Sequence, residues 1–152
     1  MKKLHVTKVL LLITMIFFLQ SCERMINRLK DNEEITTAQQ DCIVKVIAKD
    51  DSIGKVRNRQ SKSISLSQSI TNYTEGMKKI STEGCPKDFA RDFNSHIKAW
   101  NDLLIVTDKY PELRGDMHDL LLQLEKSKDS TELKKLKGGI WQTWELLEKR
   151  PN

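Results

Sequence analysis

The sequence predicts an all-α protein, an antiparallel bundle of four to five helices. Two observations indicate this class: apolar residues recur at spacings of three and four along most of the chain, and short turn-forming segments separate these stretches. The run from Ile43 to Ala48 has strand propensity, but the helical period extends beyond it on its N-terminal side. Amphipathic helices joined by short connections favour an antiparallel bundle.

The first 21 residues have the pattern of a secretory signal peptide. Lys2, Lys3 and Lys8 accompany an apolar run of eleven residues from Val9 to Leu19. A basic start followed by about 7–15 apolar residues is typical of such a leader. The run is too short to cross roughly 30 Å of hydrocarbon, which needs about 20 residues, so a transmembrane anchor is the weaker interpretation. We therefore expect the bundle to follow a cleaved leader.

The leader ends in Leu19-Gln20-Ser21-Cys22, which resembles the lipobox of bacterial lipoproteins. In that family the cysteine thiol receives a diacylglyceryl group and the preceding peptide is removed. A cysteine is suited to alkylation as a nucleophile, and two or more acyl chains give stable anchoring. The alternative is an ordinary secretory leader followed by an unmodified cysteine.

The lipobox resemblance implies a division of the chain into three parts. Residues 1–21 would be the signal peptide, residues 22–32 the lipidated Cys22 with its tether, and residues 33–150 the helical domain. The protein would then lie in the bacterial cell envelope, on the periplasmic or surface side. Its membrane contact would be the lipid on Cys22.

The charge balance argues against a nucleic-acid partner. The chain has 26 basic and 21 acidic residues and a net charge of +5. The three lysines of the leader leave with it, so 23 basic residues and a net charge of +2 remain. A nucleic-acid-binding domain is expected to carry a strongly basic face, and export argues against such a partner too.

Cys42 and Cys85 are the cysteines that remain once Cys22 is assigned to the lipid. An even number of cysteines in an oxidising compartment indicates a disulfide. Two buried free thiols are the alternative, because the sequence does not tell whether the two Cα atoms come within bonding distance. A lone pair of cysteines supplies too few ligands for zinc.

The first helix is expected to begin at Asp31 or Asn32, where Asp31 and Glu34 fit a capping box. Its apolar stripe is Ile35, Ala38, Cys42 and Val46. We expect turn chemistry at Asp50–Gly54 to end this helix. The segment Lys55–Ser65 is basic and serine-rich, and it is either a long loop or a helical extension.

Two helices are expected in the middle of the chain. One runs from about Ser65 to Ser81, and the other opens at Pro86 and stops near Tyr110, because the residue before a proline is disfavoured in a helix. Their apolar stripes are Leu66, Ile70, Tyr73, Met77 and Ile80 in the first, and Phe89, Phe93, Ile97, Trp100 and Leu104 in the second.

Two more helices complete the expected bundle. One covers Arg114–Lys126, and the other starts at Asp129, which forms a capping-box pattern with Glu132. Gly138 and Gly139 inside the last helix indicate a bend or the close approach of another helix.

Four motifs resemble a group of small exported bacterial helical proteins without an assigned activity. They are Cys85-Pro86-x-x-Phe89, His96-Ile97-x-Ala99-Trp100, Arg114-Gly115-Asp116-Met117-His118 and Ile140-Trp141-x-Thr143-Trp144. Together they extend over about half of the chain after the leader. The resemblance supports a helical fold and implies no mechanism.

His96, Trp100 and His118 are the candidate ligand-binding residues. His96 and Trp100 are four residues apart on one expected helix, so their rings can touch. The alternative for His96 is a packed histidine that is hydrogen-bonded to a carbonyl or a carboxylate. His118 could join His96 or Glu112 across helices.

No motif of the sequence indicates a metal, a cofactor or catalysis. A His-Glu-x-x-His motif and a pair of Glu-x-x-His motifs are absent, and so is the Cys-x-x-Cys-His motif of covalent haem. Two histidines after the leader leave little material for a catalytic triad. We therefore expect neither an enzyme nor a cofactor-binding protein.

Two functions remain as hypotheses. The first is a membrane-anchored, non-catalytic interaction or scaffold module with a partner among envelope proteins. The second is a periplasmic bundle that binds a small ligand or a metal. Trp100, Trp141 and Trp144 bear on the choice. We expect them in the core, whereas an exposed tryptophan would indicate a partner-binding surface.

Overall fold

The computed structural model describes residues 35–149, which form helices and turns without a strand. The all-α prediction is confirmed for this part of the chain. The helices are α2 (Thr37–Gln60), α3 (Leu66–Lys78), α4 (Lys87–Asp102), α5 (Leu104–Thr107), α6 (Met117–Leu124) and α7 (Ser130–Glu148). The leader, Cys22, the tether and the Asp31–Glu34 pair lie outside the described residues.

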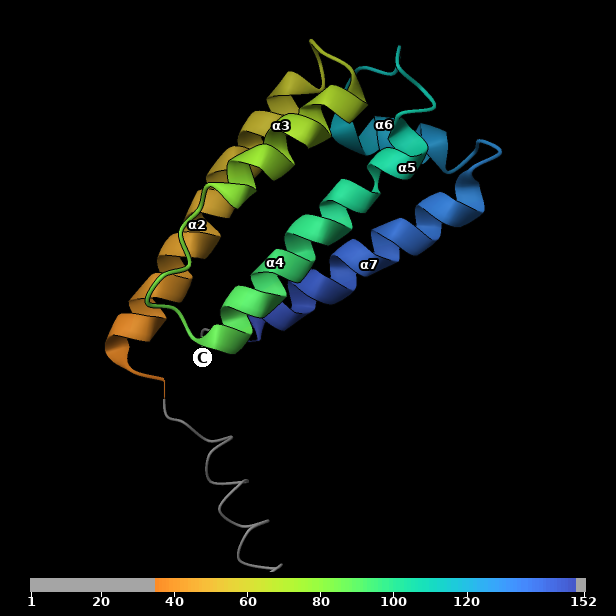
Figure 1. Cartoon of the computed structure of the whole chain (residues 1–152). Helices are drawn as coiled ribbons and strands as arrows, with labels where there is room; N and C mark the ends of the chain where they lie inside the picture. The colour runs from red at the N-terminus through yellow and green to blue at the C-terminus, as the bar shows by residue number, and fades with distance from the viewer. Residues whose placement is uncertain (1–34, 150–152) are drawn as a thin grey trace, which may run out of the picture. The chain divides into compact units, whose positions relative to one another are not determined.

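The four long helices form an antiparallel series (Figure 1). Helix α2 packs against α3, α3 against α4, and α4 against α7, and each helix runs opposite to the neighbour it packs on. The short helices α5 and α6 lie together at one end of the bundle. The predicted architecture is therefore confirmed.

Helix α2 begins later than the sequence predicts. Ile35 and Thr36 are not helical, and Thr36 is the N-cap residue. Its hydroxyl accepts from the Gln39 N–H at 3.2 Å, and the Gln39 side chain accepts from the Thr36 N–H at 2.9 Å. This reciprocal capping box satisfies N–H groups that a helix start leaves open. A helix continuous from Asp31 or Asn32 is therefore wrong.

Helix α2 also ends later than predicted, because the turn-forming residues at Asp50–Gly54 are helical. The Asp50 side chain is buried and accepts a hydrogen bond from the Tyr73 hydroxyl at 2.7 Å. A Cβ atom at Gly76 on α3 would lie 3.3 Å from Ile53 Cδ1, so a glycine there allows α2 and α3 to approach closely. Tertiary contacts thus override the local turn preference. Of the two options for Lys55–Ser65, the helical extension holds as far as Gln60.

Helices α3 and α4 follow the predicted stripes. Ser65 caps α3 through its side chain, and the faces of both helices that carry the stripes are largely buried. Helix α4 stops at Asp102, however, and does not run to Tyr110. After Asp102, the Leu103 N–H donates to the Trp100 carbonyl at 3.2 Å, which is a tighter turn than that of an α-helix. Leu103 and Val106 are buried in the core. The predicted end is wrong for this reason.

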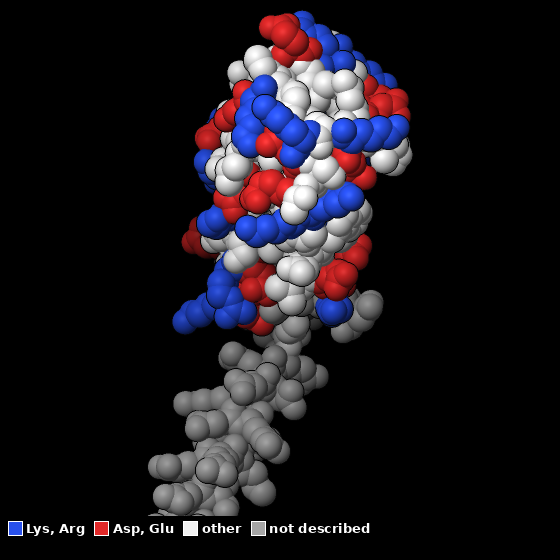
Figure 2. Space-filling view, turned by 90° about the vertical axis from the view of Figure 1, so that its right-hand side faces the viewer, with Lys and Arg blue, Asp and Glu red and all other residues white. Residues whose placement is uncertain are grey.

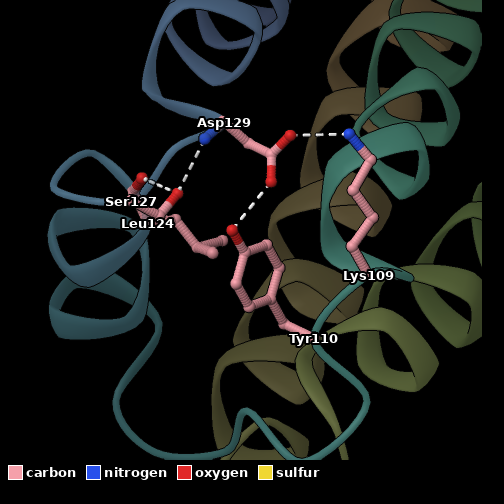
Figure 3. A network of polar contacts seen from close by, with 5 residues as sticks. All are labelled: Lys109, Tyr110, Leu124, Ser127 and Asp129. Atoms are coloured by element: carbon pink, nitrogen blue, oxygen red, sulfur yellow. Dashed lines mark hydrogen bonds and ion pairs between the residues drawn. The ribbon is translucent and has the colours of Figure 1, made fainter.

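Asp129 precedes α7 but does not form the predicted capping box. Its side chain makes no cap hydrogen bond and accepts instead from Lys109 Nζ at 2.6 Å and from the Tyr110 hydroxyl at 2.7 Å. Ser127 Oγ accepts from the Asp129 N–H and donates to the Leu124 carbonyl (Figure 3). Asp129 therefore connects the segment after α5 to the start of α7.

Gly138 and Gly139 do not mark a close helix approach. No atom of a neighbouring element lies within 4 Å of where their Cβ atoms would be. Helix α7 passes through both residues without interruption. The expectation of a close approach at this pair is wrong.

The core has two clusters of buried apolar side chains. The disulfide-end core comprises Ile43, Val46, Tyr73, Met77, Phe89, Phe93, Ile97 and Leu147. The loop-end core comprises Leu66, Ile70, Leu103, Val106, Met117, Leu120, Leu124, Leu133 and Ile140. Trp100 packs against both clusters and so joins them.

Cys42 and Cys85 form a disulfide with Cα atoms 5.2 Å apart. The predicted bridge is confirmed, and the alternative of two free thiols is wrong. Both cysteines pack against the disulfide-end core. The bridge ties the first turns of α2 to the residue before Pro86, where α4 is about to begin.

Basic and acidic side chains intermingle over the face drawn in Figure 2. Between residues 35 and 149, no helix is long and apolar enough to cross a membrane.

Candidate functional site: a cleft between α2 and α7

A cleft of about 360 Å³ lies between α2 and α7, with residues of α3 and α4 at its base. Its volume falls within the range of about 300–1,000 Å³ that is typical of small-molecule sites. The lining residues are Asp50, Asp51, Gly54, Lys55, Arg57, Asn58, Tyr73, His96, Trp100, Leu103, Leu121, Lys137, Ile140, Trp141 and Trp144. Aromatic rings and three cationic side chains thus face one concave surface.

His96 is held by hydrogen bonds on both ring nitrogens. The Trp100 indole N–H donates to His96 Nε2 at 3.1 Å, and His96 Nδ1 lies 2.8 Å from Thr143 Oγ1. An indole nitrogen can only donate, so Nε2 must accept and Nδ1 must carry the proton. Nδ1 then donates to Thr143, whose hydroxyl donates to carbonyls of its own helix, Gly139 or Ile140. This chain of donors fixes His96 as a neutral imidazole.

The environment of His96 also favours the neutral form. Burial and the nearby charge of Arg57 lower the pKa of His96 to about 4. The side chain is 2% exposed. His96 is therefore the packed histidine that the sequence left as an alternative. Its surroundings include the expected carbonyl, that of Ile140, beside the Trp100 indole and the Thr143 hydroxyl.

Asp50, Tyr73 and Arg57 form a second polar group beside His96. Asp50 is 4% exposed and accepts from the Tyr73 hydroxyl. Burial raises the pKa of Asp50, against the lowering effect of Tyr73 and Arg57. The Arg57 guanidinium lies over two rings, with Cζ 4.4 Å from the centroid of Tyr73 and 4.0 Å from that of Trp100. These are cation–π contacts.

Trp141 and Trp144 form an aromatic wall on α7. Trp144 is half-buried, with its ring 5.6 Å from the His96 ring. Trp141 is 62% exposed although it lines the cleft. The expectation of a core position is therefore wrong for Trp141. An exposed indole at the edge of a concave surface is a typical feature of a binding site.

The structure brings together two of the three candidate ligand-binding residues. His96 and Trp100 both line the cleft, and their rings are in edge contact. His118 is exposed on α6 and is not among the lining residues, so it does not join His96. The candidate trio is wrong in this member, because α6 contributes Leu121 to the lining of the cleft, whereas His118 on the same helix is exposed outside it.

Asp50, Arg57 and Tyr73 line the cleft although they were not predicted as site residues. Asp50, Gly54 and Arg57 step by four and three, which places them on one face of a helix. This spacing was not recognised, because the first helix was predicted to end at Asp50–Gly54, which left Arg57 outside it. A continuous helix would have aligned all three toward the Tyr73 face of α3.

The buried polar groups of the cleft are engaged with one another. Both nitrogens of His96 are occupied, and the Asp50 carboxylate is engaged by Tyr73. Among residues 35–149, no group of three or more His, Cys, Asp or Glu side chains could hold a metal ion. What the cleft offers a ligand is exposed aromatic surface and positive charge.

Comparisons of this chain with protein-family models, with curated proteins and with solved structures found no match.

Proposed function

We propose that the chain is a lipid-anchored, non-catalytic binding protein of the bacterial envelope, with the cleft between α2 and α7 as its site for a small ligand. The anchor rests on the leader and on Leu19-Gln20-Ser21-Cys22. The observation that carries the binding role is the exposed Trp141 at a cleft whose other rings are buried or half-buried. Exposure of the apolar indole surface to water is unfavourable, and a bound ligand would cover this surface.

A small ligand fits this site better than a flat protein surface does. The cleft is concave, and its volume of about 360 Å³ suits a molecule of one or two rings. The second candidate is an envelope protein that inserts a side chain beside Trp141, which the exposure of this ring also favours.

Photo-crosslinking in living bacteria tests the binding role. A photoreactive amino acid replaces Lys55, which is exposed and lines the cleft, in the full membrane-anchored chain. The matched control replaces Val44, which is exposed on α2 and does not line the cleft. Illumination should add a defined small mass at position 55 and none at position 44. Identical mass spectra for the two positions would contradict a binding role for the cleft.

The size of the adduct separates the two candidates. A small added mass supports a small ligand, whereas a crosslinked band with the mass of a second protein supports the envelope partner. The same sample tests the anchor, because the intact mass should lack residues 1–21 and include acyl groups on Cys22. A wild-type chain with an unmodified Cys22 would contradict the anchor without affecting the result at the cleft.

A further inference from the structure

Arg57 is the most constrained cation of the cleft. Tyr73 and Trp100 hold its guanidinium by their ring faces, and Asn58 Oδ1 accepts from its Nε at 3.1 Å and its Nη2 at 3.0 Å. A guanidinium has five N–H donors, so these contacts leave donors available. The group is thus fixed in direction before any ligand arrives.

No carboxylate pairs with this guanidinium. None of the ion pairs formed between residues 35 and 149 includes Arg57, whereas the other two cations of the cleft are paired. Lys55 lies 2.6 Å from Asp51, and Lys137 pairs with Glu125. Asp50 is close enough to act on the charge of Arg57, but its hydrogen bond goes to Tyr73. Arg57 is therefore a partly desolvated cation without a direct counter-ion.

A desolvated cation without a counter-ion costs free energy, which an anion in the cleft would offset. The lining residues carry three cations and the two carboxylates of Asp50 and Asp51. Asp51 is engaged by Lys55 and Asp50 accepts from the Tyr73 hydroxyl, so neither carboxylate forms an ion pair with Arg57. The guanidinium of Arg57, which has no ion-pair partner, is thus the group of the cleft that a negatively charged ligand would bind.

The walls of the cleft favour a flat apolar body. Trp141 presents most of its indole to solvent, Trp144 is half-buried beside it, and Ile140 lies on the same helix face. Indole faces stack well on other aromatic rings. A carboxylate matches the planar fork of a guanidinium. The two requirements belong to one molecule, because Arg57 and Trp141 line the same cleft.

We propose that the cleft binds a small aromatic carboxylate, with its acid group on Arg57 and its ring against Trp141 and Trp144. This inference rests on the proposed binding role of the cleft and adds the chemical class of the ligand. It assigns Arg57 as the residue that selects for negative charge and Trp141 as the residue that selects for an aromatic body.

The test compares 2-naphthoate with its neutral amide, 2-naphthamide. The two probes share a ring system and differ in charge. The full chain is held in lipid nanodiscs, empty nanodiscs correct for partition into lipid, and tryptophan fluorescence and calorimetry report binding. The carboxylate should bind at least tenfold more tightly than the amide. Equal affinities, or binding of neither probe, would overturn the proposal.

Three variants assign the preference to its residues. Arg57→Gln should abolish the preference for the carboxylate, and Arg57→Lys should retain part of it through charge alone. Arg59→Gln is the matched control, because Arg59 is exposed on the same helix and does not line the cleft. Trp141→Ala should weaken both probes by a similar factor. A preference that survives in Arg57→Gln would overturn the role of Arg57.

The outcomes keep the two proposals separate. If both probes bind equally and depend on Trp141, the ligand class is wrong and the cleft remains a binding site. If crosslinking at position 55 gives no specific adduct and neither probe binds, the binding role itself fails.

Discussion

The two ends of the domain are held together by different means. At the disulfide-end core, a covalent bond joins Cys42 to Cys85, and the stacked rings of Phe89 and Phe93 lie 6.3 Å apart. At the loop-end core, hydrogen bonds join segments that are distant in the sequence. Gly115 N–H donates to the Ser61 carbonyl at 2.8 Å, and the Ser61 hydroxyl donates to the Gly115 carbonyl at 3.0 Å.

This difference bears on the cleft, which lies where the two cores meet. Tyr73 belongs to the disulfide-end core, Leu103 and Ile140 belong to the loop-end core, and all three line the cleft. The disulfide acts partly on the unfolded chain, whereas the loop-end hydrogen bonds exist only in the folded state. The two ends should therefore respond to different perturbations, and the cleft should be sensitive to both.

Reduction of the disulfide should cause the largest loss of stability. The bridge spans a sequence separation of 43 residues, for which the chain-entropy model gives about 4 kcal/mol. Urea unfolding of the full chain, with and without a reductant, measures the difference in the free energy of unfolding. Amide hydrogen exchange should show the loss of protection first in the early turns of α2 and α4, and later in α6.

The double variant Cys42→Ser/Cys85→Ser is the control for side effects of the reductant. Its urea midpoint should be low and the same in both conditions. If the urea midpoint of the wild type did not change on reduction, the disulfide would not stabilise its end of the domain. The proposed difference between the two ends would then be wrong.

His96 sits between the two ends and should make stability depend on pH. Its pKa is about 4 in the folded state, and the ordinary value is 6.5. Between these values the unfolded state binds the proton more readily, so stability falls as the pH drops from about 6.5 to about 4. At about 1.4 kcal/mol per unit, the contribution of His96 is roughly 3 kcal/mol, fully present above pH 6.5.

The matched measurement is the pH dependence of unfolding in His96→Gln. Carboxylates also titrate near the lower end of this range, and the difference between wild type and variant cancels their effect. The variant should lose less stability than wild type on acidification from pH 7 to pH 4. Parallel curves for the two proteins would mean that folding does not lower the pKa of His96, which would contradict its burial as a neutral acceptor for the Trp100 indole.

The sequence predicted the parts of the fold that depend on the spacing of apolar residues along a single helix. The stripe of Leu66, Ile70, Tyr73 and Met77 is buried as expected, because a helix face is set by spacing alone. The boundaries that failed depend on partners elsewhere in the chain. Asp50 remains in α2, where its carboxylate accepts from Tyr73. Asp129 is the N-cap residue of α7, but its side chain binds Lys109 and Tyr110 and not the helix N–H groups.

For the candidate site too, the sequence predicted only the contacts that lie within one helix. His96 and Trp100 were found because their contact lies within one helix at a spacing of four. Arg57 was missed because nothing in the local sequence shows that α2 and α7 face each other across a cleft. Trp141 was considered as a partner-binding residue, but a core position was expected for it. Contacts within a single helix can be predicted from the sequence, whereas a surface shared by five helices is defined only once they pack.

Thr107 gives the smallest expected effect and tests how well the loop-end core is satisfied. The residue is 0% exposed, and its hydroxyl has no hydrogen-bond partner among the described residues. Thr107→Val keeps the shape and removes the unsatisfied group, so it should raise the free energy of unfolding by about 1 kcal/mol. Urea unfolding measures the gain.

Thr74→Val is the matched control, because the Thr74 hydroxyl is buried but donates to the Thr71 carbonyl at 3.0 Å. A gain in the free energy of unfolding for Thr107→Val and a loss for Thr74→Val would locate an uncompensated polar group at the loop end. A change of the same sign in both variants would contradict this difference between the two sites.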